Sequence, residues 1–122
     1  MAHRLTLKDN WIHVEYFDVV DSFDVIEQLA QPQFRDGLAR FQRVIFDYSD
    51  ATEINFDDED MKQFATLGRI LGGMHDKVIV AIVLMSPERL ENAEKYKEAS
   101  TTPSWDVTVC FNLDEAEQVM RR

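Results

Sequence analysis

The sequence predicts an α/β domain with a mixed, mostly parallel sheet and an antiparallel hairpin at its N-terminus. Strand-like and helix-like segments alternate along the chain in the order β-β-α-β-α-β-α-β-α. Strands that alternate with helices are typical of right-handed crossovers, which build parallel sheets covered by helices. The 122 residues, 45% of them hydrophobic, are enough for one core, so we expect a single domain over residues 1–122.

The charge and the cysteine content limit the partners and the compartment that fit this chain. The net charge of −10 argues against nucleic acid and anionic membrane surfaces, because phosphate contacts need clustered Lys and Arg. A single cysteine cannot form an intramolecular disulfide, which fits a reducing compartment. No apolar run approaches the ~20 residues of a membrane-spanning helix, and the N-terminus lacks the apolar stretch of a secretory signal. We therefore expect a cytoplasmic protein without a transmembrane segment.

The N-terminal part of the chain predicts a hairpin followed by a helix. The segments "RLTLK" and "WIHVEYF" alternate apolar and polar residues, and "DN" between them is a turn-prone pair. The segment from Asp21 to Gln31 has apolar residues at helical spacing, with Asp21 or Ser22 available as the N-cap. Pro32 ends this predicted helix, because the residue before a proline disfavours helical geometry.

A loop and a strand are expected next. We interpret "QPQFRDGLARFQ" as a connecting loop that is anchored to the core by Phe34, Leu38 and Phe41. The following "RVIFDYS" is apolar and β-branched, which favours a strand. It leads into the most acidic stretch of the chain, "FDYSDATEINFDDED".

Helix capping explains the second half of that acidic stretch. With Asp57 as N-cap, the acids from Asp58 to Asp60 fall in the first turn, where the helix dipole favours negative charge. Phe56 and Met61 take the two positions of a hydrophobic staple, and the helix ends at "GG". Capping leaves the acids in the first half of the stretch unexplained, namely Asp47, Asp50 and Glu53.

The C-terminal half predicts two more strand–helix pairs. "KVIVAIVLM" is apolar without alternation, as expected of a strand that is covered on both faces. "SPERLENAEKYKEA" opens with Ser86 as cap and Pro87 at the first helical position. "WDVTVCF" is the last strand, and "NLDEAEQVM" is a helix in which Asn112 and Glu115 have the spacing of a capping box.

Motifs for catalysis, metal binding and nucleotide binding are not visible in the sequence. Counted from Asp47, the sixth position of an EF-hand loop would be Thr52 instead of Gly, and the carboxylates near Asp57 predict a solvated cluster more than a metal site. "GRILGG" lacks the spacing of phosphate-binding loops, and no Lys follows the last strand, as a phosphoaspartate receiver would need. Cys110 lies within an apolar strand and predicts a buried, inert thiol. We expect no enzyme, no cofactor and no metal.

Two segments carry a resemblance to a known family. "RVIFDYSDATEINFDDEDMKQF" resembles the central segment of STAS domains of the anti-sigma-factor-antagonist type, in which a phosphorylatable Ser or Thr begins the helix. "QPQFRDGLARFQRVIFDYSDA" and "WDVTVCFNLDEAEQVM" are similar to small stand-alone bacterial proteins with the SpoIIAA-like fold, which is related to lipid-binding domains. The resemblance covers nearly the whole chain. Its acceptor position falls on Asp57, so it implies a module without the usual serine phosphoswitch.

Two functions follow from these observations. The first is a non-enzymatic, STAS-like interaction or regulatory module that binds a protein partner through Asp50, Thr52, Asn55, Asp57 and Asp58. The alternative is a carrier or sensor of a small apolar ligand or lipid, with a cavity formed by Phe34, Leu38, Phe41, Met74 and Met85. A homodimer through the exposed hairpin strand or an apolar helix face is a further expectation.

Overall fold

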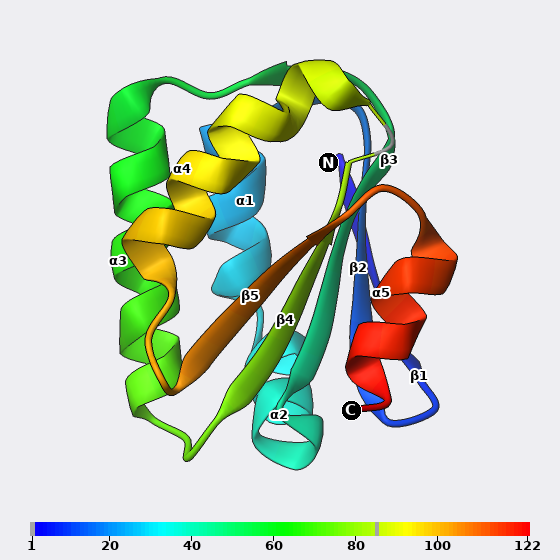
Figure 1. Ribbon diagram of the computed structural model, residues 1–122, viewed down its shortest axis with the longest axis vertical. Helices are drawn as coiled ribbons and strands as arrows, with labels where there is room; N and C mark the ends of the chain where they lie inside the picture. Colours follow the sequence, from blue (N-terminus) through cyan, green and yellow to red (C-terminus); the bar gives the residue numbers. More distant parts are fainter. Residues whose placement is uncertain (1, 85) are drawn as a thin grey trace.

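The computed structural model describes residues 2–84 and 86–122, and a five-stranded sheet lies between two layers of helices (Figure 1). The strands are β1 (His3–Lys8), β2 (Trp11–Asp21), β3 (Arg43–Asn55), β4 (Val78–Val83) and β5 (Trp105–Cys110). Their order in the sheet is the order in the chain, β1-β2-β3-β4-β5. The β1–β2 pair is antiparallel, and all other pairs are parallel. The predicted α/β class with its mixed sheet and N-terminal hairpin is confirmed.

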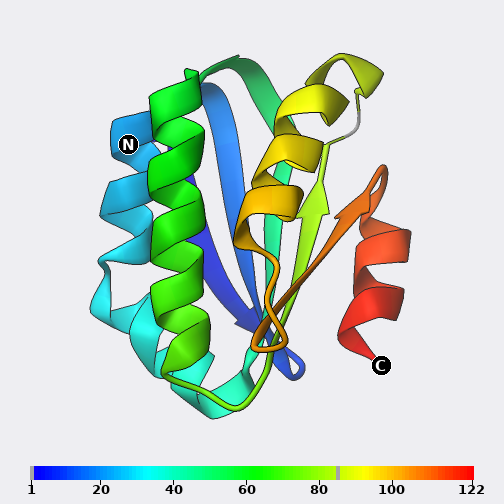
Figure 2. The same ribbon diagram turned by 60° about the vertical axis from the view of Figure 1, so that its left-hand side comes forward.

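The helices cover both faces of the sheet unequally. They are α1 (Ser22–Leu29), α2 (Pro32–Phe41), α3 (Asp58–Gly73), α4 (Leu90–Ser100) and α5 (Leu113–Met120), with a short 3-10 helix, η1 (Pro87–Arg89), before α4. Helices α1 to α4 lie on one face and α5 lies on the other (Figure 1, Figure 2). The core is divided accordingly into a large cluster under α1 to α4 and a smaller one between the sheet and α5. Within the described residues, no helix combines the length and apolar character needed to span a membrane.

One predicted loop is a helix. Residues 31–42 were expected to connect two elements as a loop, but Pro32–Phe41 forms α2. Pro32 occupies the start of the helix, where its missing N–H costs nothing, and Phe34, Leu38 and Phe41 have the spacing of one helical face. Phe34 and Leu38 are buried against the sheet. The order of elements therefore contains two consecutive helices between β2 and β3.

The two long central strands run well past their neighbour β4. β3 pairs with β4 only from Arg43 to Asp47, whereas it pairs with β2 as far as Asn55. The β2–β3 pairing has two register shifts, each with an additional residue on β3, and Asp18 of β2 has a left-handed backbone (φ 58°) beside the second shift. The first half of the acidic stretch is thus strand and not loop, and Asp50 lies exposed along it.

The predicted cap of α3 is confirmed in detail. The Asp57 side chain accepts a hydrogen bond from the Asp60 backbone N–H (2.8 Å), and the Asp60 side chain accepts one from the Asp57 N–H (3.0 Å). This reciprocal capping box satisfies two backbone donors that the helix leaves unpaired. The acids of the first turn, Asp58 to Asp60, face the positive end of the helix dipole.

The start of α4 differs from its prediction. Ser86 precedes η1 and makes no side-chain capping bond, and the α-helix proper begins at Leu90. The preceding strand was expected to reach residue 85, but β4 ends at Val83, and Met85 lies outside the described residues.

Candidate functional site

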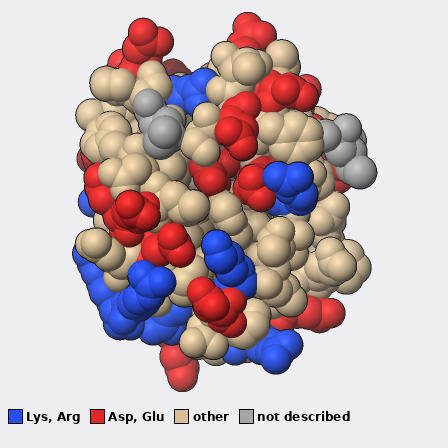
Figure 3. Space-filling model, turned by 90° about the vertical axis from the view of Figure 1, so that its right-hand side faces the viewer, with Lys and Arg blue, Asp and Glu red and all other residues tan. Residues whose placement is uncertain are grey.

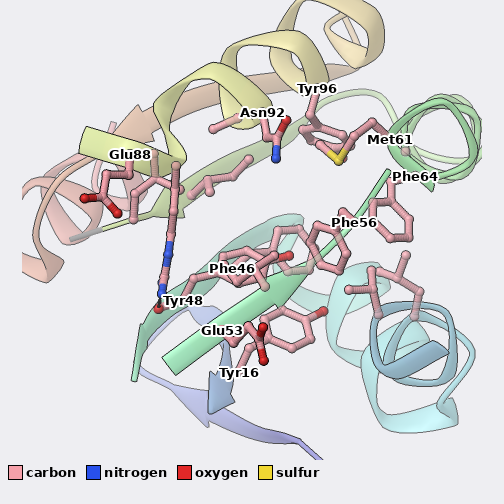
Figure 4. Close-up of a pocket in the computed structure, with 18 of the residues that line it drawn as sticks. Tyr16, Phe46, Tyr48, Glu53, Phe56, Met61, Phe64, Glu88, Asn92 and Tyr96 are labelled. Atoms are coloured by element: carbon pink, nitrogen blue, oxygen red, sulfur yellow. Dashed lines mark hydrogen bonds between the residues drawn. The ribbon is translucent and has the colours of Figure 1, made fainter. Parts of the chain in front are cut away.

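A cavity of about 340 Å³ lies between the sheet and the helices α1, α3 and α4. Figure 4 shows Met61, Asn92 and Tyr96 on one side of it, Tyr16 and Phe46 on the other, and Phe56 and Phe64 at one end. Its floor is the sheet, with Tyr16, Phe46, Tyr48, Ile82 and Leu84; its walls include Val25, Leu29, Met61, Phe64, Leu71, Ala93 and Tyr96. This volume is at the lower end of the ~300–1,000 Å³ that is usual for small-molecule sites.

Small residues on the helices leave this space open. Gly68 of α3 lies against the indole of Trp105 and the hydroxyl of Tyr96, so α3 packs closely on α4 and the start of β5. Ala93 of α4 faces the cavity with a single methyl group. Because α3 is held against α4 and β5, the space above the central strands is not filled by helix side chains.

Aromatic side chains dominate the walls. Tyr16 and Tyr48 stack with ring centroids 4.7 Å apart, and Phe56 meets Tyr48 and Phe64 edge-on at 6.3 and 5.0 Å. Such pairs are worth about 0.5–1.5 kcal/mol each beyond the area they bury. The aromatic rings of the wall therefore pack against one another as well as against the cavity.

A few polar groups face the cavity. The side chains of Tyr48 and Asn92 make no hydrogen bond to any other described residue, although both line the cavity. Burial raises the pKa of Tyr48 above its usual value, so its hydroxyl stays protonated at neutral pH. The cavity thus combines an apolar interior with two polar groups, the half-buried Tyr48 hydroxyl and the Asn92 amide, which is exposed to solvent.

Charged side chains surround the mouth of the cavity, at the C-terminal ends of the central strands. Glu53 and Glu88 are exposed and line it together with Thr52 and Arg89. The Arg89 guanidinium donates one hydrogen bond to the Tyr48 carbonyl oxygen (2.9 Å) and one to the Ala51 carbonyl oxygen (2.6 Å). These bonds tie η1 to the extended part of β3 and fix the width of the mouth.

A buried amide lies directly behind the wall. The Tyr16 hydroxyl donates to the Gln28 side-chain oxygen (3.1 Å), and Gln28 is fully buried in α1. Its amide nitrogen has no hydrogen-bond partner among the described residues. An unpaired buried donor costs about 1–3 kcal/mol, so a group that reaches Gln28 past Tyr16 would be stabilised there.

The residues predicted to form an apolar cavity do not line this one. Phe34 and Leu38 are fully buried between α2 and the sheet, where they stabilise the core. Phe41 packs against the same core and Met74 is 69% exposed at the end of α3. Met85 lies outside the described residues. The sequence suggested a cavity formed by one segment, residues 34–41, together with Met74 and Met85, whereas the residues that line this cavity come from β2, β3, α1, α3 and α4.

The predicted partner surface is exposed and lies beside the mouth of the cavity. Thr52 lines the cavity, and Asp50 and Asn55 are exposed on β3. Asp57 is occupied as the cap of α3, and Asp58 lies 3.8 Å from the Lys95 amine. The capping role means that replacing Asp57 would weaken α3 as well as any contact with a partner. Protein binding at this surface stays a prediction.

A second pair of polar residues, on the face that carries α5, was not predicted from the sequence. The His13 ring Nε2 lies 2.9 Å from the Asp47 carboxylate, and the Ser49 backbone N–H donates to the other Asp47 oxygen (2.9 Å). Only 12% of the His13 side chain and 8% of the Asp47 side chain are exposed. The pair joins β2 to β3, and it accounts for one of the acids that helix capping left unexplained.

This pair predicts a specific loss of stability in acid. Burial by itself would raise the pKa of Asp47, but hydrogen bonds from His13 and Ser49 outweigh it and hold that pKa below its usual value. The ionised carboxylate therefore stabilises the fold above about pH 4, the pKa in the unfolded chain, and this contribution is lost as pH falls through the lower folded-state pKa. We expect the free energy of unfolding, from urea titrations at several pH values, to fall less steeply below about pH 4 in Asp47→Asn than in the wild type. Asp36→Asn, at an exposed position of α2, should keep the wild-type slope.

A shallower hollow of about 720 Å³ lies at the other end of the molecule. Its three arginines already have structural roles. Arg43 donates to the carbonyl oxygens of Met120 and Arg122 (2.7 Å each) at the end of α5, and Arg121 lies over the Trp11 ring. Arg40 lies over the ring of Phe41. These contacts explain the basic residues without a ligand.

In comparisons with known proteins, no family model, no curated protein and no solved structure matches the chain.

The described residues contain no group of three or more His, Cys, Asp or Glu side chains that could hold a metal ion. Cys110 is buried beneath α5, and burial raises the pKa of its thiol. The resemblance to STAS domains stays an expectation. The structure therefore shows an α/β domain with a cavity that is lined largely by aromatic side chains.

Proposed function

We propose that this protein binds a small, mainly apolar ligand in the cavity between the sheet and α3, as a carrier or sensor. The observation that carries the proposal is the cavity itself: about 340 Å³ lined by aromatic and aliphatic side chains. Transfer of each CH₂ group of a ligand from water into such a site contributes about 0.8 kcal/mol. A ligand of modest size therefore gains useful affinity from burial alone.

The geometry also supports selectivity. The stacked Tyr16–Tyr48 pair and the edge-on Phe56 fix the shape of the site, so a ligand does not have to order the walls when it binds. The unpaired groups of Tyr48 and Asn92 would orient a ligand that carries one or two polar atoms. A carrier or sensor needs both properties, because it has to retain one class of molecule.

Native mass spectrometry on protein purified without lipid or detergent tests this proposal. We expect an additional mass that is lost on denaturation. In Ala93→Leu the larger side chain fills the space that Ala93 leaves. The fraction of protein that carries the additional mass should then fall by about tenfold or more while the fold is retained. Ala99→Leu, at an exposed position of the same helix, should keep the wild-type fraction of ligand-bound protein.

Bare protein in every preparation, together with no binding of apolar probes in solution, would contradict the proposal. Loss of the ligand in both Ala93→Leu and Ala99→Leu would also contradict it, since of these two residues only Ala93 lines the cavity.

A further inference from the structure

A buried amide at the inner wall of the cavity is not explained by the packing of the core. Gln28 is fully buried in α1 and shares a helix face with Val25 and Leu29, which line the cavity. Its side-chain oxygen accepts a hydrogen bond from the hydroxyl of Tyr16 (3.1 Å), which is also a lining residue. The nitrogen at the other end of the same amide has no hydrogen-bond partner among the described residues. Buried groups without partners are rare in native proteins, and a functional role is one recognised reason for them.

Tyr48 supplies a second hydrogen-bond donor beside this amide. Its ring stacks on that of Tyr16, with centroids 4.7 Å apart and an angle of 15° between the ring planes. Both rings project from the same face of two parallel neighbouring strands, so their hydroxyls lie on the cavity side of the sheet. Burial raises the pKa of Tyr16 well above its usual value, and the nearby Tyr48 hydroxyl raises it further. Both hydroxyls are therefore protonated at neutral pH, and that of Tyr48 is free to donate.

The charged side chains lie away from this inner wall. Among the described residues that line the cavity, only Glu53, Glu88 and Arg89 are charged, and they are at the mouth. Figure 3 shows the other charges on one outer face, with acidic side chains toward one end of the molecule and most basic ones toward the other. Besides burial, the negative charge of Asp24 contributes to the raised pKa of Tyr16, so the field here opposes a further negative charge. An ionised group without a partner would be much more costly to bury at this wall than a neutral polar group.

We infer that the ligand is a neutral, mainly apolar molecule with a carbonyl oxygen, which accepts hydrogen bonds from the Tyr48 hydroxyl and the Gln28 amide; this rests on the proposed function. A carbonyl oxygen has two lone pairs, so it can accept from both donors at once. Tyr16 holds the oxygen end of the Gln28 amide, which leaves the nitrogen end to donate beside the Tyr16 ring. Ketones, esters and amides share this chemistry.

Four probes that share a phenyl ring and a four-carbon chain test the inference. Butylbenzene and 1-phenylbutan-1-one differ only by the carbonyl oxygen, whereas 1-phenylbutylamine is a cation and 4-phenylbutyrate an anion at neutral pH. NMR titrations can follow the indole N–H signal of Trp105, because this residue lines the cavity. We expect the hydrocarbon and the ketone to bind, and both ions to bind at least about tenfold more weakly than the ketone.

Variants show whether the two donors hold the carbonyl oxygen. Tyr48→Phe keeps the stacked ring and removes only the hydroxyl, and Gln28→Met keeps the length of the side chain and removes the amide. Each should weaken ketone binding about threefold to tenfold and leave hydrocarbon binding unchanged. The hydrocarbon affinity in the same variant reports whether the cavity is intact, so damage to the fold is recognised. Gln118→Met, at an exposed position of α5, should keep both wild-type affinities.

The outcomes separate this inference from the proposed function. If neither variant changed the ketone affinity, if both probes weakened alike, or if an ion bound as tightly as the ketone, the carbonyl assignment would be wrong while ligand binding stands. A response of Tyr48→Phe alone would overturn the contact with Gln28. A copurified ligand without a carbonyl oxygen would overturn the whole inference. If none of the four probes binds and native mass spectrometry shows bare protein, both proposals fail.

Discussion

Replacing Leu38 by alanine should destabilise the protein by about 2–5 kcal/mol and leave ligand binding to the folded protein intact. Leu38 is 1% exposed where α2 packs on the sheet, and it does not line the cavity. Its removal leaves a hollow that the surrounding side chains fill only in part, and domains of this kind have only about 5–15 kcal/mol of stability in total. Urea unfolding followed by tryptophan fluorescence measures the loss.

The exposed Leu7 provides the control for this substitution. It is 48% exposed on β1, so Leu7→Ala should cost about 1 kcal/mol or less. A similar loss of stability in both variants would contradict the assignment of Leu38 to the core. If Leu38→Ala lost the bound ligand under conditions where the protein stays folded, Leu38 would contribute to the ligand site, as the sequence first suggested.

The sheet was predictable because each strand carries a local pattern. The alternation in β2 and the continuous apolar run in β4 distinguish a half-covered strand from one buried on both faces. The helix starts at Asp21, Asp57 and Asn112 were predictable for the same reason, since capping needs only residues within one turn.

Two of the differences between the predicted and the observed elements have clear physical causes. Pro32 follows the end of one helix and occupies the first turn of the next. In a sequence, a proline is typical of both positions, so it did not distinguish a loop from a second helix. The extension of β3 to Asn55 depends on its pairing with β2, which continues as far as Asp21. No local sequence pattern predicts this extension, because contacts across the sheet fix it. Acidic residues on a bent, exposed strand resemble a loop when pairing is not known.

The cavity was out of reach of sequence reasoning. Its walls join residues from Tyr16 to Trp105, and an apolar side chain has the same pattern whether it fills a core or lines a cavity. A signal was present in the small residues: Gly68 and Ala93 lie on the buried sides of α3 and α4, where larger residues would be expected. The His13–Asp47 pair was equally hidden, because the two residues meet only through the parallel register of β2 and β3.

The close packing of α3 at Gly68 depends on the absence of a Cβ atom at this position. A Cβ atom at this position would lie 2.8 Å from the Trp105 indole nitrogen and 3.0 Å from the Tyr96 hydroxyl oxygen. These two groups are bonded to each other, with the indole N–H donating to the hydroxyl (3.1 Å), and both side chains are buried. Neither group can move without breaking this bond or shifting α3.

Gly68→Ala should therefore destabilise the protein by about 1–3 kcal/mol, although alanine favours a helix by about 1 kcal/mol over glycine. Gly73→Ala is the matched control: a Cβ there meets nothing within 4 Å, so the same substitution in the same helix should be neutral or stabilising by up to about 1 kcal/mol. Urea unfolding gives the sign of each change, and the NMR shift of the Trp105 indole proton reports whether its bond to Tyr96 survives. If both variants were stabilised alike, α3 would not be held against Trp105 and Tyr96, and the packing that keeps the cavity open would need another cause.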